Sequence, residues 1–320
     1  MNKLIVPGMS VLAMLAMPAL AQKYPAKPVR MIVPYTPGGP TDILARAVGQ
    51  SLTEVWGQPV IIENRPGASG NVGTAIAAKS PADGYTLGVV GISYSVAPAL
   101  EAKLGYDPVR DLTPVVLLAS VNNLFVVHPS LPARSVKELI AFAKARPGEV
   151  SFASGGPGGA QHLAGELFNS MAGIKMTHIP YKGSAPGLTA LIGGEVIVGF
   201  TDMLISLPHA RSGKLRALAV TGAARSSLIP ELPTVAEAGL AGYAVTAWFG
   251  LLAPAATPTE IIAQLNGEIV KSLRTTQMKE RLAALGADAA AGSPADFAAF
   301  LRNEMTKWAQ VVKSAGIRGE

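Results

Sequence analysis

The residues of this chain whose types suit ligand chemistry are glycines and small hydroxyl residues, grouped in loops that precede expected helices. Gly38 and Gly39 form one such loop, Gly67 and Ser69 belong to a second, and residues 155–159 form a third. Glycine leaves backbone N–H groups open to a ligand, and a helix N-terminus adds partial positive charge, so these loops suit a carboxylate. One loop alone would indicate only a tight turn, but matched loops favour an anion-binding cleft.

Four polar side chains stand where they could reach the same ligand. Thr41 follows the first loop and could present its hydroxyl while starting a helix, and Gln161 follows the third loop. Ser93 and Asp202 each end the third strand expected in their half of the chain, a position that lines the crevice of an open α/β sheet. Asp202 could accept hydrogen bonds from a ligand hydroxyl or amine, or it could orient neighbouring backbone amides.

For other residues near these loops, a structural role explains the residue type better than a ligand contact does. Asp42 stands where a helix N-cap is preferred, so we expect a cap rather than a ligand contact. We expect His162 to be a packing residue, and Trp248 with Phe249 to belong to the core of a long strand. None of these four is therefore counted among the ligand contacts.

The sequence lacks the motifs that common enzyme and metal sites require. It contains no Gly-x-Ser-x-Gly nucleophile elbow, no His-Glu-x-x-His zinc motif and no nucleotide-binding P-loop. It has no cysteine, and its four histidines are far apart without ligand spacing. We therefore expect a binding protein with no metal and no cofactor. Two alternatives stay open: a ligand-sensing module for a membrane partner, and an exported α/β enzyme acting on carboxylates through Asp42, Asp202 or His162.

Composition excludes several other classes of protein. Charged residues make up 15% of the 320 residues and aromatic residues 6%, while glycines number 34 and prolines 25. Such a chain is neither disordered nor a coiled coil, and its length is typical of about two domains. The net charge of +6 comes from scattered lysines and arginines, without the clustered basic surface that nucleic acid requires.

Residues 1–21 are predicted to be a secretory signal peptide. Lys3 provides a positive start, residues 4–20 are mainly apolar, and Ala19-Leu20-Ala21 fits the small-x-small rule for cleavage after Ala21. No cysteine follows to carry a lipid anchor. We therefore expect the mature chain in the periplasm.

Strands and helices alternate along the mature chain, and the order of elements repeats. Gly38-Gly39-Pro40 recurs 117 residues later as Gly155-Gly156-Pro157, and Gly67 matches Gly183 at an offset of 116. Two loops that repeat at nearly one offset indicate two lobes of one architecture.

The predicted fold class is α/β with two lobes, each a mostly parallel sheet flanked by helices, and a cleft between the lobes. Residues 111–127 look like a strand pair that crosses between the lobes, and residues 243–253 like a long strand that crosses back. Lobe 1 then comprises residues 22–123 plus 236–320, and lobe 2 comprises residues 124–235.

Several motifs carry a family resemblance in their order along the chain. They include PYTPGGPTDILAR at residues 34–46, HLAGELF at 162–168 and HIPYKGSAPGLTALIGGEV at 178–196. Together they resemble the tripartite tricarboxylate transporter receptor family, the Bug receptors, over nearly all of the mature chain. The resemblance implies a periplasmic-binding-protein architecture that closes on a small carboxylate, such as a di- or tricarboxylate or an aromatic acid. It also implies a partner, a membrane carrier with a large and a small integral subunit; we expect a monomer without a nucleic-acid partner.

The resemblance also implies which positions contact the ligand. In that family, backbone amides and small polar groups of the strand-to-helix loops hold the ligand carboxylate, partly through ordered waters. This chain departs from the family in residues 156–160, where the family often carries Ser or Thr, and this departure favours a less polar ligand end. The implied positions are Gly39, Thr41, Ser69 and Ser93 in lobe 1, and Ser154, Gly159, Gln161 and Asp202 in lobe 2.

Overall fold

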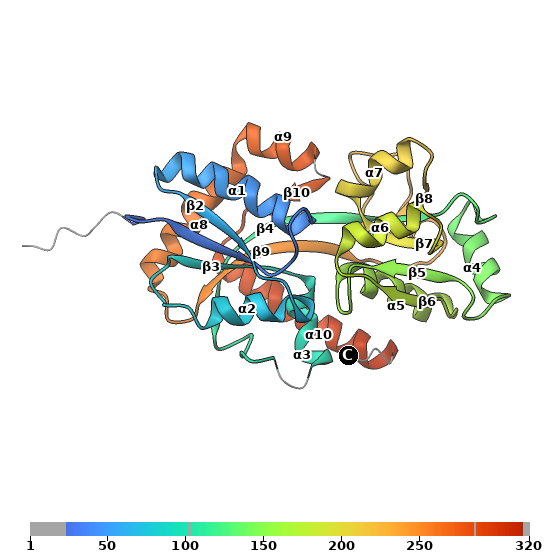
Figure 1. Ribbon diagram of the computed structural model, residues 1–320, viewed down its shortest axis with the longest axis horizontal. Helices are drawn as coiled ribbons and strands as arrows, with labels where there is room; N and C mark the ends of the chain where they lie inside the picture. Colours follow the sequence, from blue (N-terminus) through green and yellow to red (C-terminus); the bar gives the residue numbers. More distant parts are fainter. Residues whose placement is uncertain (1–23, 102–103, 285, 316–320) are drawn as a thin grey trace, which may run out of the picture.

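The chain folds into two lobes that lie side by side, each a sheet with helices packed on it (Figure 1). The computed structural model describes residues 24–101, 104–284 and 286–315. The predicted signal peptide, residues 1–21, lies outside the described residues. Among the helices in these ranges, none has the length and apolar character needed to cross a bilayer. The two-lobed α/β architecture is the one that the sequence predicted.

The sheet of the first lobe combines parallel strands with an antiparallel one. Its strands are β1 (Val29–Val33), β2 (Val60–Asn64), β3 (Thr86–Gly91), β9 (Thr246–Pro254) and the short β10 (Ala287–Ala289). β2, β1 and β3 lie side by side in parallel, and β9 pairs with β3 in antiparallel register. β3 is buried along its whole length, as expected of a central strand that pairs on both sides, with β1 and β9, and is covered by helices.

The sheet of the second lobe repeats this plan. Its strands are β5 (Ser151–Ser154), β6 (Thr177–Pro180), β7 (Val198–Asp202) and β8 (Arg216–Val220), together with the end of β4 (Leu112–Val127). β6, β5 and β7 are parallel, and β4 pairs in antiparallel register with both β7 and β8. Three parallel strands and an antiparallel crossing strand therefore occur in each lobe.

β4 is one continuous strand that belongs to both lobes. It pairs with β9 from Leu112 to Asn122 and with β7 from Asn123 to Val127. The sequence predicted a pair of strands in this region. The run after Pro114 contains no glycine or proline that would turn the chain, so the backbone stays extended and finds partners in both sheets.

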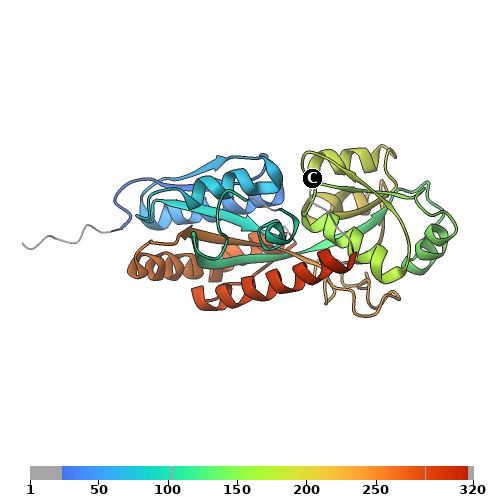
Figure 2. The same cartoon turned by 90° about the horizontal axis from the view of Figure 1, so that it is seen from below.

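Helices follow the parallel strands and cover the sheets. They are α1 (Pro40–Trp56), α2 (Asn71–Ala78), α3 (Ile92–Leu100), α4 (Val136–Lys144), α5 (Ala160–Ala172), α6 (Ser184–Ile192), α7 (Met203–Arg211), α8 (Thr259–Arg274), α9 (Thr276–Ala284) and α10 (Pro294–Ala315), with the 3-10 turn η1 (Ala68–Gly70) before α2. The long helix α10 runs along the underside of the molecule (Figure 2) and contacts α3, β4 and α5. It therefore touches elements of both lobes.

The segment between β8 and β9 packs on the second lobe. The hydroxyl of Tyr243 donates to the carbonyl oxygen of Ala164 at 2.9 Å, and the N–H of Val245 donates to the carbonyl oxygen of Thr221 at 2.8 Å. We therefore propose that lobe 2 continues to Val245, beyond the expected boundary at residues 235/236, and that the return crossing begins with β9.

One hydrophobic cluster joins the two lobes. Phe125 of β4 stacks on Phe200 of β7 with ring centroids 4.4 Å apart, and Trp248 of β9 meets Phe297 of α10 edge-on at 6.0 Å. These four rings belong to a single buried cluster, while two further clusters fill the individual lobes. The lobes are thus joined by packed side chains as well as by crossing strands.

Gly250 of β9 is a position where this shared cluster leaves no room for a side chain. A Cβ atom there would lie 2.2 Å from Cζ of the buried Phe297 ring. We expect Gly250→Ala to lower the free energy of unfolding by about 1–3 kcal/mol, because the ring must leave its packed position. Denaturant unfolding followed by circular dichroism measures the change.

Gly267→Ala in α8 is the matched control, since a Cβ atom there meets no atom within 4 Å. Alanine in a helix interior is more stable than glycine by about 0.5–1 kcal/mol, so this variant should be more stable than the wild type. Equal stability of the two variants would mean that β9 and α10 are not tightly packed at Gly250.

Candidate functional site

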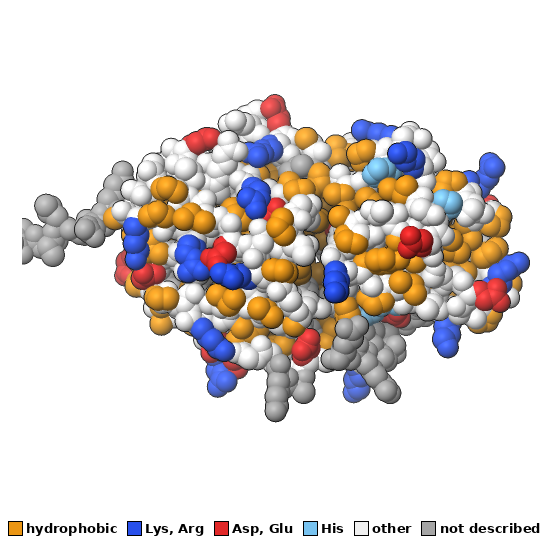
Figure 3. Space-filling view, viewed as in Figure 1, with side chains coloured by type: hydrophobic (Ala, Val, Ile, Leu, Met, Phe, Trp, Pro, Cys, Tyr) orange, Lys and Arg blue, Asp and Glu red, His pale blue; other side chains and the backbone are white. Residues whose placement is uncertain are grey.

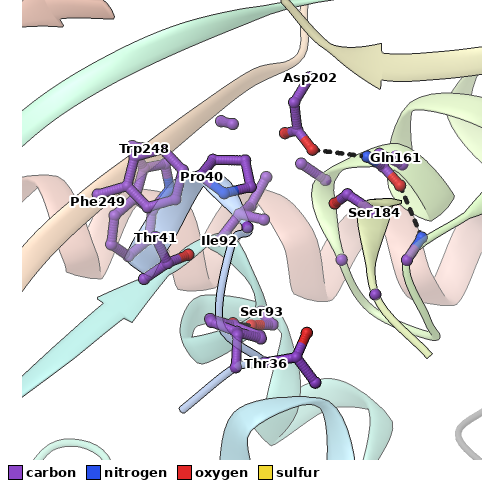
Figure 4. Close-up of a pocket in the computed structure, with 18 residues that line it drawn as sticks. Thr36, Pro40, Thr41, Ile92, Ser93, Gln161, Ser184, Asp202, Trp248 and Phe249 are labelled. Atoms are coloured by element: carbon purple, nitrogen blue, oxygen red, sulfur yellow. Dashed lines mark hydrogen bonds between the residues drawn. The ribbon is translucent and has the colours of Figure 1, made fainter. Parts of the chain in front are cut away.

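A cavity of about 110 Å³ lies between the two lobes, where their strand-to-helix loops face each other (Figure 4). Its wall is formed by residues at the N-termini of α1 and α3 in lobe 1, of α5, α6 and α7 in lobe 2, and by β9. For scale, an apolar cavity of about 150 Å³ holds benzene, so the space suits a small organic molecule. Helix N-termini carry unpaired N–H groups and partial positive charge, which favours an anion here.

Asp42 holds the first-lobe loop in place. Gly38, whose φ is +82°, donates its N–H to Asp42 Oδ2 at 3.0 Å. Asn64 donates to Asp42 Oδ1 at 2.9 Å, and Arg46 forms an ion pair with the same carboxylate. Burial alone would raise the pKa of Asp42, but hydrogen bonds from Arg46, Gly38 and Asn64 hold it below its ordinary value. Asp42 is therefore ionised and engaged by the protein.

The start of α1 differs from the expected one. Pro40 occupies the first helical position, where proline fits because no N–H partner is needed, so the N-cap is Gly39 and not Asp42. Asp42 acts from inside the first turn on a residue before the helix. Gly39 makes no side-chain cap, which leaves the N–H groups of the first turn available to a ligand.

The second-lobe loop has the same geometry. Gly158, with a φ of +70°, donates its N–H to Nδ1 of His162 at 3.0 Å, again four residues along the chain. Gly159 is the N-cap of α5 with φ and ψ of −75° and 163°, close to the −79° and 168° of Gly39. Neither N-cap has a side chain that occupies the helix end.

This geometry corrects the offset of the internal repeat. Gly158 corresponds to Gly38 at an offset of 120, whereas the sequence matched Gly38 with Gly155 at 117. The sequence match followed the Gly-Gly-Pro letters. What repeats in the structure is a backbone pattern, a left-handed glycine followed by an extended glycine and then a helix.

Gln161 and Asp202 form the polar wall of the cavity on the lobe-2 side (Figure 4). Gln161 accepts the N–H of Gly155 on Oε1 at 2.6 Å and donates from Nε2 to Asp202 Oδ2 at 2.8 Å. Ser184 at the start of α6 also lines the cavity, and its hydroxyl hydrogen-bonds to the Asp202 carboxylate. The protein thus holds both side chains in fixed orientations.

Hydroxyl groups of lobe 1 face this wall. Thr36 and Thr41 line the cavity, and Ser93 lines it while sharing a hydrogen bond with the hydroxyl of Tyr35. Ser93 lies in the first turn of α3 and not at the end of the strand as expected, because that helix begins directly after β3. Burial raises the pKa of Tyr35, against the opposing effect of the Ser93 hydrogen bond, so the phenol stays neutral.

An apolar wall completes the cavity. Trp248 and Phe249 of β9 are 2% and 6% exposed, so they are core residues as expected, yet both also line the cavity beside Pro40 and Ile92. Trp248 Nε1 donates to Glu304 Oε2 of α10 at 2.9 Å, which fixes the plane of the indole ring. This wall offers a ligand packing surface without charge.

Six of the eight expected contact positions line the cavity, and Ser69 and Ser154 do not. Ser154 is buried at the end of β5, where Oγ accepts the N–H of Gly156 at 3.1 Å and lies 2.6 Å from Nε2 of His178. Ser69 lies in η1 with a φ of +53°. The role of both serines in binding stays a prediction. The six lining positions are Gly39, Thr41, Ser93, Gly159, Gln161 and Asp202.

Sequence reasoning missed three polar lining residues, Tyr35, Thr36 and Ser184. A signal for Ser184 existed, because it directly follows Gly183, which the sequence had already matched with Gly67. Tyr35 and Thr36 lie between β1 and the first glycine pair.

The electrostatics of the cavity come from dipoles and one acid. Its lining contains no lysine and no arginine, and Asp202 is its carboxylic acid. On the face shown in Figure 3, lysines and arginines are spread among acidic and neutral side chains. Within the described ranges, no group of three or more His, Asp or Glu residues is placed to hold a metal ion. A bound anion would therefore depend on N–H, hydroxyl and amide donors.

His162 and His178 stack beneath the second-lobe loop with ring centroids 4.0 Å apart. Burial lowers the pKa of His162 to about 4, and burial together with His162 lowers that of His178 to about 3. Both rings are neutral at neutral pH, so Nδ1 of His162 can accept the N–H of Gly158. His162 is 6% exposed and does not line the cavity, in agreement with the expected packing role.

Comparison with known proteins identifies relatives along almost the whole chain. Residues 44–317 match the model of the tripartite tricarboxylate transporter family receptor. The chain is 41% identical over 306 residues to Protein BugT of Bordetella pertussis, covering 95% of this chain and 94% of BugT.

Solved structures share the fold across both lobes. The R. palustris protein Rpa4515, solved with adipate, superposes with a TM-score of 0.89 at 41% identity, covering 92% of this chain and 99% of that one. The periplasmic binding protein BugD superposes with a TM-score of 0.86 at 33% identity, covering 93% of this chain and 100% of that one.

The buried histidines predict a loss of stability in acid. Below the ordinary histidine pKa of 6.5 the unfolded chain gains a proton on His162 that the folded protein does not bind until about pH 4. The contribution of His162 to the free energy of unfolding should therefore fall by about 3 kcal/mol as the pH is lowered through this range.

His162→Asn isolates this effect, because asparagine keeps an acceptor for the Gly158 N–H but takes up no proton. Urea unfolding of both proteins between about pH 7 and pH 4 should show a shallower pH dependence in the variant. Parallel profiles would contradict the expected pKa of His162.

Proposed function

The chain belongs to the tripartite tricarboxylate transporter receptor family, and we propose that it captures a small organic acid in the periplasm by closing its lobes around it. The observation that carries this proposal is the cavity between the lobes, which the N-termini of five helices line. Neither lysine nor arginine is among the residues that line it. Backbone N–H groups and helix dipoles suffice to bind a carboxylate in a site that excludes water.

The proposed contacts divide between the two lobes. Gly39 and Gly159 allow the ligand to approach the N–H groups at the starts of α1 and α5, and Thr41 and Ser93 add hydroxyl donors from lobe 1. The apolar wall, including Trp248, would pack against the carbon chain of the acid. Gln161 and Asp202 would bind the far end of the ligand. Ser69 and Ser154 would add hydroxyl contacts to the ligand from the neighbouring loops.

Ligand binding would favour the closed arrangement, because a ligand held by both lobes contributes contacts that an open arrangement lacks. The lobes approach closely at the cavity mouth. A Cβ atom added to Gly183 of lobe 2 would lie 3.1 Å from Thr36 Oγ1 of lobe 1, and one added to Gly158 would lie 3.0 Å from Leu100 Cδ1. Small residues at these points let the loops meet across the ligand.

The remaining parts of the proposal follow from family membership and from the N-terminal sequence. The precursor would be cleaved after Ala21, and the mature receptor would act as a monomer that delivers its acid to a carrier with a large and a small integral membrane subunit. Binding without chemical turnover is the proposed activity, with no cofactor. Adipate, the acid bound in the Rpa4515 structure, is the first candidate ligand, followed by other dicarboxylates and aromatic acids.

Blocking the cavity tests this function. Ala160, the first residue of α5, lines the cavity, and a phenylalanine ring there would fill a space of about 110 Å³. We expect Ala160→Phe to weaken binding of adipate or another acid found by thermal shift more than about 100-fold, because ring and ligand compete for the same volume. Isothermal titration calorimetry measures the affinity.

Ala263→Phe on the exposed face of α8 is the matched control and should bind like the wild type. Both variants should unfold within a few degrees of the wild type without ligand. The proposal fails if no small acid raises the unfolding temperature of the wild type, or if Ala160→Phe binds the acid with wild-type affinity.

A further inference from the structure

Asp202 is a carboxylic acid that the cavity encloses without a cation. It is 5% exposed at the end of β7, and it lines the cavity (Figure 4). Its partners are neutral groups: the Gln161 amide at 2.8 Å, the Ser184 hydroxyl and its own backbone N–H. In the described part of the chain, no lysine, arginine or histidine nitrogen forms a salt bridge with it.

The Asp202 carboxylate does not have the structural role that Asp42, the other buried acid near the cavity, has. Asp42 is paired with Arg46 and holds the N–H of Gly38. Asp202 is the N-cap residue of α7, but its side chain makes no cap hydrogen bond to that helix. Its carboxylate instead faces the space that a ligand would occupy.

An ionised Asp202 would conflict with an acidic ligand. Two carboxylates in one enclosed site repel each other, and the shared site then holds a proton on one of them. The side chains around Asp202 provide no positive charge to remove the conflict: Gln161 on α5 and Ser184 on α6 are neutral, and Tyr35, the other titratable residue of the lining, stays protonated.

We propose that Asp202 binds the far end of the ligand as a neutral carboxylic acid, and that capture of the ligand takes up one proton from the solvent. This inference rests on the proposed function. The proton would sit on the Asp202 carboxyl group and donate a hydrogen bond to a ligand oxygen, and it would return to solvent when the lobes open. Burial raises the pKa of Asp202, against the opposing hydrogen bonds of Ser184, Gln161 and its own N–H, which is the direction that the proposal requires.

A neutral Asp202 restricts the class of ligand that the cavity can bind. One end of the acid is an ionised carboxylate at the helix N-termini, the middle is apolar against Trp248 and Phe249, and the far end carries an oxygen acceptor for Asp202. A linear dicarboxylate meets all three requirements. An amino acid does not, because its ammonium group would require an ionised Asp202.

Calorimetry with adipate as the probe counts the proton. Titrations of the wild type in phosphate and in Tris at about pH 8 differ in apparent enthalpy in proportion to the protons exchanged with the buffer, and we expect an uptake close to one. The dissociation constant should rise about tenfold for each pH unit above neutrality. Adipate binding with no proton uptake, at pH 7 and at pH 8, overturns the inference and leaves the proposed function intact.

Asp202→Asn assigns the proton to this residue, because the asparagine amide is neutral at every pH and can donate to a ligand oxygen. We expect the variant to bind adipate with no proton uptake and with a pH-independent dissociation constant. Glu166→Gln is the matched control: Glu166, on α5 and outside the cavity lining, also has a pKa raised by burial, so it is a second group that could take up a linked proton. That control should keep an uptake of one.

Three results would count against Asp202 as the proton carrier: uptake retained in Asp202→Asn, uptake lost in Glu166→Gln, or an amino acid that binds the wild type more tightly than adipate does. Thermal unfolding without ligand shows whether each variant is folded before its titration is interpreted. If neither adipate nor any other acid binds the wild type, the proposed function fails together with this inference.

Discussion

The two glycine loops that face each other across the cavity depend on one kind of interaction, a hydrogen bond from a glycine N–H to the side chain four residues further along the chain. In lobe 1 the acceptor is the Asp42 carboxylate, and in lobe 2 it is Nδ1 of His162. Each bond holds a glycine in the left-handed conformation directly before the helix. The next residue, Gly39 or Gly159, is the N-cap and has no side chain. The two acceptors differ chemically, but each is kept in its accepting form by its surroundings: Arg46 and other donors keep Asp42 ionised, and burial keeps His162 neutral.

This arrangement explains how a site for an anion manages without a cationic side chain. The proposed donors are main-chain N–H groups, whose directions are set when the helices form, so they would need little reorganisation when a ligand arrives. The side chains that complete the cavity wall are themselves held by hydrogen bonds within the protein. Gln161 is held between Gly155 and Asp202, and Trp248 is held by Glu304. The low charge content of the chain is consistent with a site of this kind.

The connection between the lobes sets where this site can be. β4 runs through both sheets, and β9 returns the chain to the sheet of lobe 1. A shared buried cluster contains the stacked rings of Phe125 and Phe200 together with aromatic residues of α10. The parallel strands therefore point their carboxyl ends, and the helices that follow them, into the space between the lobes. β9 adds the apolar wall, so the strand that returns the chain to lobe 1 also lines the cavity.

Sequence reasoning identified the α/β class, the two lobes, the family and six positions that line the cavity. These follow from local rules: glycine before a helix, apolar runs as strands, and motifs in a fixed order. It placed the repeat three residues early, because it matched residue identities. In the structure the feature that recurs is the positive φ, at Gly38 and at Gly158. It split β4 in two and placed Ser93 at the end of a strand and not in a helix, because strand pairing and the immediate start of α3 depend on neighbours distant in sequence.

By itself, the sequence predicted an anion site at glycine loops that precede helices, and two of these loops, at Gly39 and at Gly159, lie at the cavity. This prediction rests on composition and glycine spacing, which are local properties. Only the tertiary structure decided which groups meet. Thr36 and Ser184, nearly 150 residues apart in sequence, line one cavity, while Ser154 lies beneath its loop against His178. The charge environment of Asp202 was likewise a tertiary outcome, because burial and the absence of a facing cation arise only when the two lobes come together.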